Sequence, residues 1–210
     1  MASAIIHIAV ANELNKTIKK DNKKLLIGSI APDIAKQIGR EKYTSHFSTE
    51  DNADIPNLNL FLEKYKNHMD DDFVLGYYIH LYTDYLWFKY FMTEIQDKNN
   101  LLTKLNGEIV KCDENTLTLY IYNDYTNLNK QVIDNYNLDL KIFYEELPQF
   151  DNIIKEVPMD RMQVLIDRMG IIVASSGNEK QILFNINHIE TFIKLSTELI
   201  LNNILEFQNN

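Results

Sequence analysis

His80 and Asp84 stand four residues apart in the stretch GYYIHLYTD, so on a helix both side chains lie on one face. An unpaired buried carboxylate is costly and normally takes up a proton instead. Neutral imidazole and carboxylate are zinc-type ligands, so a divalent cation would satisfy both side chains. Gly76, one turn earlier on the same face, is expected to leave room for an ion or a substrate. Taken alone, the pair is more typical of a structural hydrogen bond than of a metal site.

Three more ionisable residues occur in unusual settings within the first 84 residues. His7 interrupts the apolar run AIIHIAV, Asp33 ends the stretch GSIAPD, and His46 lies in the polar segment TSHF. Each has an ordinary interpretation: a packed core histidine, a helix cap and a solvated loop residue. Taken with the pair above, they raise the expectation of a metal site. The remaining histidines, His68 and His188, lie near expected helix ends and are predicted to take no part.

Helical patterns dominate the chain and must position these side chains. Only six glycines and four prolines occur in 210 residues, fewer than a protein of strands and turns usually needs. The sequence predicts an all-α fold, a single helical domain over residues 1–210 with no repeat and no linker. Residues 40–56 are expected to form a loop, and residues 107–121 permit a short hairpin. Helices are expected over residues 3–20, 56–67, 70–95, 160–174 and 188–207, and one or two helices over residues 116–147.

The ordered set of residues resembles the zinc-dependent phospholipase C family, which is related to fungal zinc-dependent single-strand nucleases. The resemblance covers about residues 1–95. It rests on a histidine in the first helix (His7), a PD motif (Pro32-Asp33), a histidine in the following loop (His46), and H-x-x-x-D on a core helix (His80 and Asp84).

The resemblance implies which residues bind each ion. One ion would be bound by Asp33, His46, His80 and Asp84, and a second by His7 and Asp84. Asp84 would therefore bridge two zinc-like ions.

The chain departs from the family pattern at two points. It begins Met1-Ala2-Ser3, whereas secreted members begin with a tryptophan whose backbone completes the shell of the second ion. Tyr90 stands near the position of the first ligand to the family's third ion, and no histidine occurs between His80 and His188. One or two zinc-like ions are therefore expected, without a complete third site.

The resemblance also implies an activity, that of a zinc-dependent hydrolase acting on phosphate ester bonds. Two carboxylates and two divalent ions would leave a local charge of about +2, which attracts a phosphate group and offsets charge developing on its oxygens. Such ions lower the pKa of bound water to about 7. By analogy with the family, Asp33 is the catalytic residue that orients or deprotonates the attacking water. The expected substrate is a small phosphate ester or a phospholipid head group.

Two other functions are open at this stage. The chain could be a noncatalytic helical domain with a structural or ligand-binding metal site, which a closed coordination shell would favour. A phosphohydrolase of the His-Asp type is also all-α and metal-dependent. That family uses an adjacent His-Asp dipeptide, which does not occur in this sequence, so it ranks lower.

The composition of the chain limits its expected cellular compartment and its expected binding partners. The formal net charge of −9 argues against a broad electrostatic surface for nucleic acid or anionic membrane. Cys112 is the only cysteine, so no internal disulfide can form, and the N-terminal residues lack a secretory signal pattern. The most apolar stretch, residues 73–92, is interrupted by polar and charged residues, so no transmembrane segment is expected. A cytoplasmic protein is predicted.

Overall fold

The computed structural model describes residues 1–52 and 54–208 of the chain and is 65% helical. The predicted all-α fold is confirmed, with one small two-stranded sheet. In chain order the elements are α1 (Ala4–Ile18), α2 (Asn22–Gly28), η1 (Ala31–Asp33), α3 (Ile34–Gln37), α4 (Lys42–His46), α5 (Leu58–Tyr65), η2 (Lys66–His68), α6 (Asp72–Leu86), η3 (Trp87–Phe91), α7 (Met92–Ile95), β1 (Leu101–Thr103), β2 (Ile109–Lys111), α8 (Glu114–Asn135), η4 (Leu140–Phe143), η5 (Met159–Arg161), α9 (Met162–Ala174) and α10 (Ile186–Gln208).

The two helices that carry most of the predicted site begin at side-chain caps. The Ser3 hydroxyl accepts a hydrogen bond from the backbone N–H of Ile6 at 3.2 Å and starts α1. The Asp71 carboxylate accepts from the N–H groups of Phe73 and Val74, both at 2.9 Å, and starts α6. Such caps satisfy N–H groups that have no partner within the helix. Both expected helix starts are therefore confirmed.

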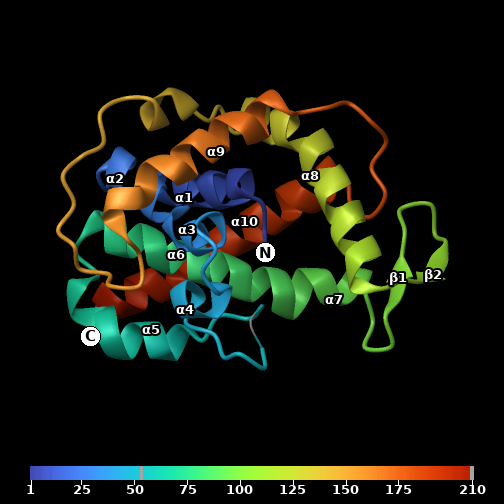
Figure 1. Ribbon diagram of the computed structural model, residues 1–210, viewed down its shortest axis with the longest axis horizontal. Helices are drawn as coiled ribbons and strands as arrows, with labels where there is room; N and C mark the ends of the chain where they lie inside the picture. Colours follow the sequence, from blue (N-terminus) through green and yellow to red (C-terminus); the bar gives the residue numbers. More distant parts are fainter. Residues whose placement is uncertain (53, 209–210) are drawn as a thin grey trace.

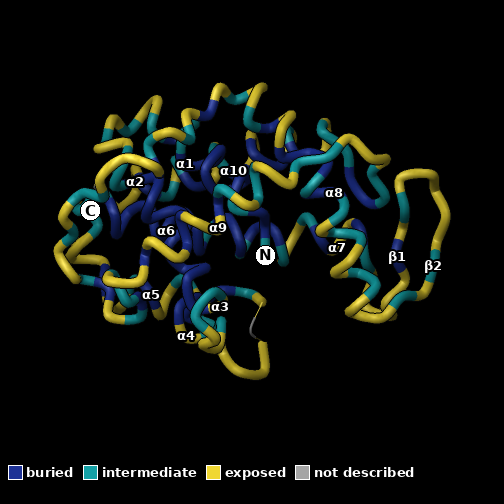
Figure 2. Tube along the Cα trace, turned by 45° about the horizontal axis from the view of Figure 1, so that its top comes forward, coloured by how far each residue is buried: buried dark blue, intermediate teal, exposed yellow. Residues whose placement is uncertain are grey.

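Helices α1 and α6 form the centre of the molecule. Helix α1 contacts α2, α6, α8 and α10, and α6 also packs against α2, α5 and α10 (Figure 1). Most of α1 and nearly all of α6 is buried, whereas the surrounding connections are largely exposed (Figure 2). Among the described residues, no helix is long and apolar enough to cross a membrane. Side chains on α1 and α6 therefore meet inside the protein core.

Two glycines bring α2 and α6 into backbone contact. A Cβ atom on Gly76 would lie 2.2 Å from the carbonyl oxygen of Leu25, and one on Gly28 would lie 2.3 Å from that of Phe73. No side chain fits at either position, because backbone atoms cannot move aside as a flexible side chain can. The expectation that Gly76 leaves room for an ion or a substrate is therefore wrong. Backbone atoms of α2 fill the space beside Gly76.

Several elements have boundaries that differ from those expected from the sequence. The expected loop over residues 40–56 contains α4, and the helix expected over residues 70–95 includes a π-helical turn at η3. The range 116–147, expected to form one or two helices, contains α8, which ends at Asn135 before the left-handed Asn137 (φ of 50°), and the short η4. The hairpin pairs β1 with β2, earlier than expected, and projects from one end of the molecule (Figure 1).

Candidate metal centre

The structure brings all five predicted side chains together. Helix α1 supplies His7, the end of η1 supplies Asp33, the last residue of α4 is His46, and α6 supplies His80 and Asp84. Their exposed fractions are 0% for His7, His80 and Asp84, 1% for His46 and 8% for Asp33. They include two groups of three potential ligands whose donor atoms all lie within 4.8 Å of one another: His7, His80 and Asp84, and Asp33, His46 and His80.

Asp84 lies between the histidines and uses its two oxygens differently. Its Oδ1 lies 3.3 Å from His7 Nε2, and its Oδ2 lies 3.5 Å from His46 Nε2 and 3.8 Å from His80 Nε2. The rings of His7 and His80 stack, with centroids 3.7 Å apart. A carboxylate with one oxygen facing each side can bridge two ions, which supports the bridging role predicted for Asp84.

Backbone carbonyls orient two of the histidines. His80 Nδ1 lies 2.8 Å from the carbonyl oxygen of Ser29, and His46 Nδ1 lies 3.2 Å from that of Lys42. A carbonyl oxygen only accepts, so Nδ1 of His80 carries the proton and donates it, whereas Nδ1 of His46 also lies 3.1 Å from the Ser45 hydroxyl, which can donate or accept. In neutral His80, Nε2 is then left with a lone pair directed toward the other predicted ligands. Hydrogen bonds of this kind commonly fix the ligand tautomer of metal-binding histidines.

The resulting arrangement brings several potential metal ligands into close contact. His46 Nε2 and His80 Nε2 are 3.2 Å apart, and Asp33 Oδ1 lies 3.6 Å from His46 Nε2. Among the described residues, no hydrogen-bond partner exists for Asp33 Oδ1, Asp84 Oδ2 or either ring nitrogen of His7. Buried polar atoms are normally paired, because leaving one unpaired is costly. A cation among these atoms would satisfy them, so the residues present fit a transition metal such as zinc.

Another buried aspartate shows how different a structural carboxylate is. Asp124 on α8 is fully buried, and it accepts from the backbone N–H groups of Ile182, Leu183 and Phe184 at 2.6–3.0 Å. Its charge is compensated without an ion. Asp33 has no comparable set of donors. It occupies the N-cap position of α3, but its side chain makes no capping hydrogen bond. The ordinary interpretation of Asp33 as a helix cap is therefore wrong.

The protonation states also suit metal binding. Burial alone would raise the pKa of Asp33, but the nearby rings of His46 and His80 lower it to about 2. Burial would also raise the pKa of Asp84, which the side chains of His7 and Lys42 lower well below its ordinary value. Burial, reinforced by His7, holds the pKa of His80 well below 6.5. Near neutral pH the carboxylates are charged and His80 is neutral, the forms that bind metal.

Two groups beside the cluster escaped the sequence analysis. The backbone N–H of Ala2 donates to Asp84 Oδ1 at 2.8 Å, and the ammonium of Lys42 lies 3.9 Å from Asp84 Oδ2. A backbone N–H leaves no signal in residue types. Lys42 stands four residues before His46, so helical spacing would have placed both on one face if α4 had been recognised.

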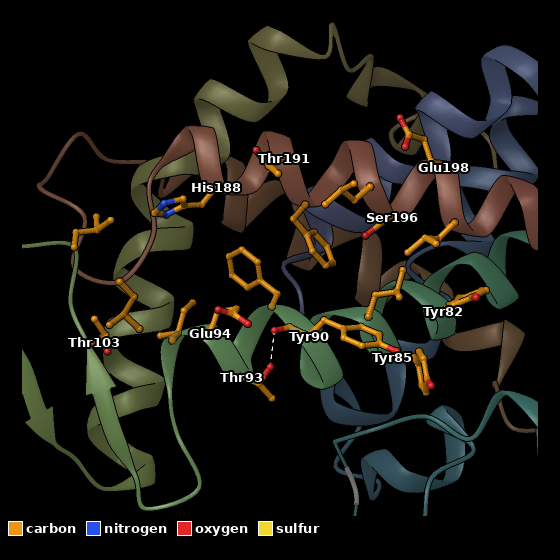
Figure 3. A pocket seen from close by; sticks show the side chains of 18 of the residues that line it. Tyr82, Tyr85, Tyr90, Thr93, Glu94, Thr103, His188, Thr191, Ser196 and Glu198 are labelled. Atoms are coloured by element: carbon orange, nitrogen blue, oxygen red, sulfur yellow. Dashed lines mark hydrogen bonds between the residues drawn. The ribbon is translucent and has the colours of Figure 1, made fainter. Parts of the chain in front are cut away.

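The remaining predictions concern residues outside the cluster. His68 is exposed at the end of η2. His188 and Tyr90 line an open groove of about 1080 Å³, where α10 faces η3 and α7 across the opening (Figure 3). None of the five clustered residues lines this groove. Tyr90 thus lies outside the cluster, and His188 takes no part in it, as predicted.

Comparison of the chain with protein-family models, with curated proteins and with solved structures gives no match.

Proposed function

We propose that this chain is a metal-dependent phosphoesterase of the zinc-dependent phospholipase C type. The observation that carries the proposal is the buried convergence of potential ligands: Nε2 of His46 and His80 lie 3.2 Å apart, with unpaired carboxylate oxygens of Asp33 and Asp84 beside them. Such an arrangement is costly in a hydrophobic core, and a bound cation compensates it. The motif order along residues 1–95 supplies the particular reaction class.

The residues would hold one or two ions. The family resemblance would assign Asp33, His46, His80 and Asp84 to one ion and His7 with Asp84 to a second. The donor atoms that lie within 4.8 Å of one another form the groups Asp33, His46 and His80, and His7, His80 and Asp84. Zinc bound there supplies Lewis acidity toward phosphoryl oxygens and activates water near neutral pH. A centre with positive local charge in a chain of net charge −9 would favour a phosphate ester over neutral substrates.

Asp33 is suited to orient the attacking water. It is the most exposed of the five residues, and its pKa of about 2 keeps it charged near neutral pH. A group with so low a pKa accepts hydrogen bonds well but is a weak base, because an efficient general base has a pKa near the working pH. Of the two roles implied by the family, orientation therefore fits Asp33 better than proton abstraction.

Metal content and hydrolysis, measured together, test this proposal. Protein purified without chelator is expected to contain one or two zinc-like ions per chain and to hydrolyse bis-p-nitrophenyl phosphate or p-nitrophenyl phosphate. Chelation should abolish the activity, and added zinc should restore it. Protein that carries no metal and takes up none would refute the phosphoesterase proposal.

The burial of the cluster favours one alternative, a noncatalytic helical domain with a structural metal. Four of the five side chains are at most 1% exposed, and structural zinc sites are typically closed. A cobalt-substituted protein distinguishes the two functions. Four-coordinate cobalt with only protein ligands and no hydrolysis of phosphate esters would establish the structural role. An exchangeable water on the ion together with hydrolysis would establish the phosphoesterase.

A further inference from the structure

A lysine ammonium lies at the edge of the candidate centre. Lys42 is the first residue of α4, the short helix that ends with His46, and its Nζ lies 3.9 Å from Asp84 Oδ2. That carboxylate oxygen faces His46 and His80 and lacks a hydrogen-bond partner among the described residues. The side chain of Lys42 is 17% exposed, whereas that of Asp84 is fully buried. The ammonium therefore lies between the buried cluster and solvent.

The contacts of Lys42 leave its ammonium free to bind an additional anion. Its Nζ lies 3.5 Å from Asp54 Oδ1 and 4.8 Å from the centroid of the Phe88 ring. The side chain of Asp54 is 65% exposed, and an ion pair with so exposed a partner is weak. The 3.9 Å separation from Asp84 is longer than a hydrogen bond. An ammonium has three N–H donors, and Asp54 occupies only one of them.

We propose that Lys42 binds a non-bridging phosphoryl oxygen of the substrate, an inference that rests on the proposed phosphoesterase function. The Asp84 carboxylate attracts the Lys42 ammonium and so holds it 3.9 Å from a predicted ligand of the ions. A phosphate group bound by those ions has oxygens that do not contact an ion, and these can accept from the free donors of Lys42. Lysine binds phosphate as a compact point charge, which suits this single contact. Lys42 thereby positions the substrate.

The test measures phosphate binding directly, apart from catalysis. Inorganic phosphate is titrated calorimetrically into zinc-loaded wild-type protein and into Lys42→Met and Lys42→Arg variants. Lys42→Met should weaken phosphate binding by about tenfold or more, the usual effect of losing a charged hydrogen bond. Lys42→Arg should stay within about threefold of the wild type, because it keeps the charge and the donors. Zinc content should be unchanged in both, and KM for a phosphate ester should follow the phosphate affinity.

Lys104→Met is the matched control. Lys104 also pairs with a carboxylate, Glu108 at 3.0 Å, and lies over an aromatic ring, Tyr120, but it follows β1 in the projecting hairpin. Its replacement should leave phosphate affinity unchanged. Equal phosphate affinity of zinc-loaded Lys42→Met and wild type would overturn the proposal, as would loss of zinc in Lys42→Met. A wild-type chain that binds no zinc would refute the phosphoesterase itself, and this inference with it.

Discussion

At the scale of single residues, the candidate centre depends most on Asp84. Its two oxygens face different histidines, and its Oδ2 is unpaired among the described residues. His7, in contrast, approaches only one of those oxygens. The contrast with Asp124, whose oxygens accept three backbone N–H groups, shows that burial alone does not mark a metal ligand. The marker is a buried carboxylate oxygen without a hydrogen-bond donor, such as Asp84 Oδ2.

Replacing these residues should therefore have unequal effects on metal content. We expect Asp84→Ala to remove bound metal and hydrolysis together, whereas His7→Ala should lose at most one ion and keep part of the metal. Elemental analysis of chelator-free protein measures both. The exposed His68→Ala serves as the control and should retain the wild-type metal content. Equal metal retention by Asp84→Ala and wild type would contradict the bridging role.

The depressed pKa values predict how the stability of metal-free protein depends on pH. The pKa of His80 is lowered when folded, so below about pH 6.5 the unfolded chain binds a proton that the folded chain does not. The contribution of His80 to the free energy of unfolding is therefore complete above that pH. It decreases as pH falls, by about 1.4 kcal/mol per pH unit for one such group. Protonation of Asp33, with a folded pKa of about 2, removes further stability as pH falls from about 4 toward 2.

Urea denaturation of chelator-treated protein at pH 7.5, 6.5 and 5.5 measures this effect. The free energy of unfolding should fall more steeply between pH 6.5 and 5.5 in wild type than in His80→Gln, which lacks the titrating ring. His68→Gln should keep the wild-type slope, because that ring is exposed. Identical slopes for wild type and His80→Gln would show that the buried ring does not control acid sensitivity.

At the scale of elements, the contact between α2 and α6 positions His80. Helix α2 ends at Gly28, and the following Ser29 carbonyl receives the Nδ1 proton of His80. The backbones of α2 and α6 meet at Gly28 and Gly76. Any side chain at these glycines would separate the helices and with them the hydrogen bond that orients His80.

Gly76→Ala should therefore destabilise the protein by about 3 kcal/mol or more, because its Cβ would overlap backbone atoms of α2. Gly170→Ala in α9 is the matched helical control. Its Cβ would meet only the hydroxyl of Tyr144, an exposed side chain that can turn away. That variant should be neutral or stabilised by up to about 1 kcal/mol, since alanine favours helix over glycine. Thermal and urea unfolding compare them, and equal losses of stability would contradict the close approach.

At the scale of the whole molecule, the candidate centre connects separate parts of the chain. Its ligands come from α1, η1, α4 and α6, and the Tyr125 hydroxyl on α8 donates to the Met1 carbonyl at 2.7 Å beside them. An ion bound by these groups in the folded state alone stabilises the fold in proportion to its saturation. Metal binding and global stability should therefore be coupled.

Zinc at a hundredfold excess over its dissociation constant should raise the free energy of unfolding by about 2.7 kcal/mol. The same zinc concentration should give little or no gain in Asp84→Ala. Urea unfolding of both proteins, with and without zinc, measures the difference. A gain of equal size in the variant would mean that zinc stabilises the chain at some other place.

Several features could be predicted from the sequence because they depend on local residue types. Helix periodicity and the shared face of His80 and Asp84 follow from spacing along a few turns. The helix α4 was missed, because five residues are too few for a periodic pattern. Its omission also hid the proximity of Lys42 to the site.

What the sequence determined by itself was the all-α class and the five residues able to bind a cation. Only the tertiary structure decided that they meet, because their convergence depends on how α1, η1, α4 and α6 pack. Packing also decided which nitrogen His80 presents, since the carbonyl of Ser29 accepts from the other one. The packing of α2 against α6 fills the space beside Gly76, so no ligand can bind there. Residue types define the available chemistry, but only packing leaves buried acceptors unpaired and facing one another.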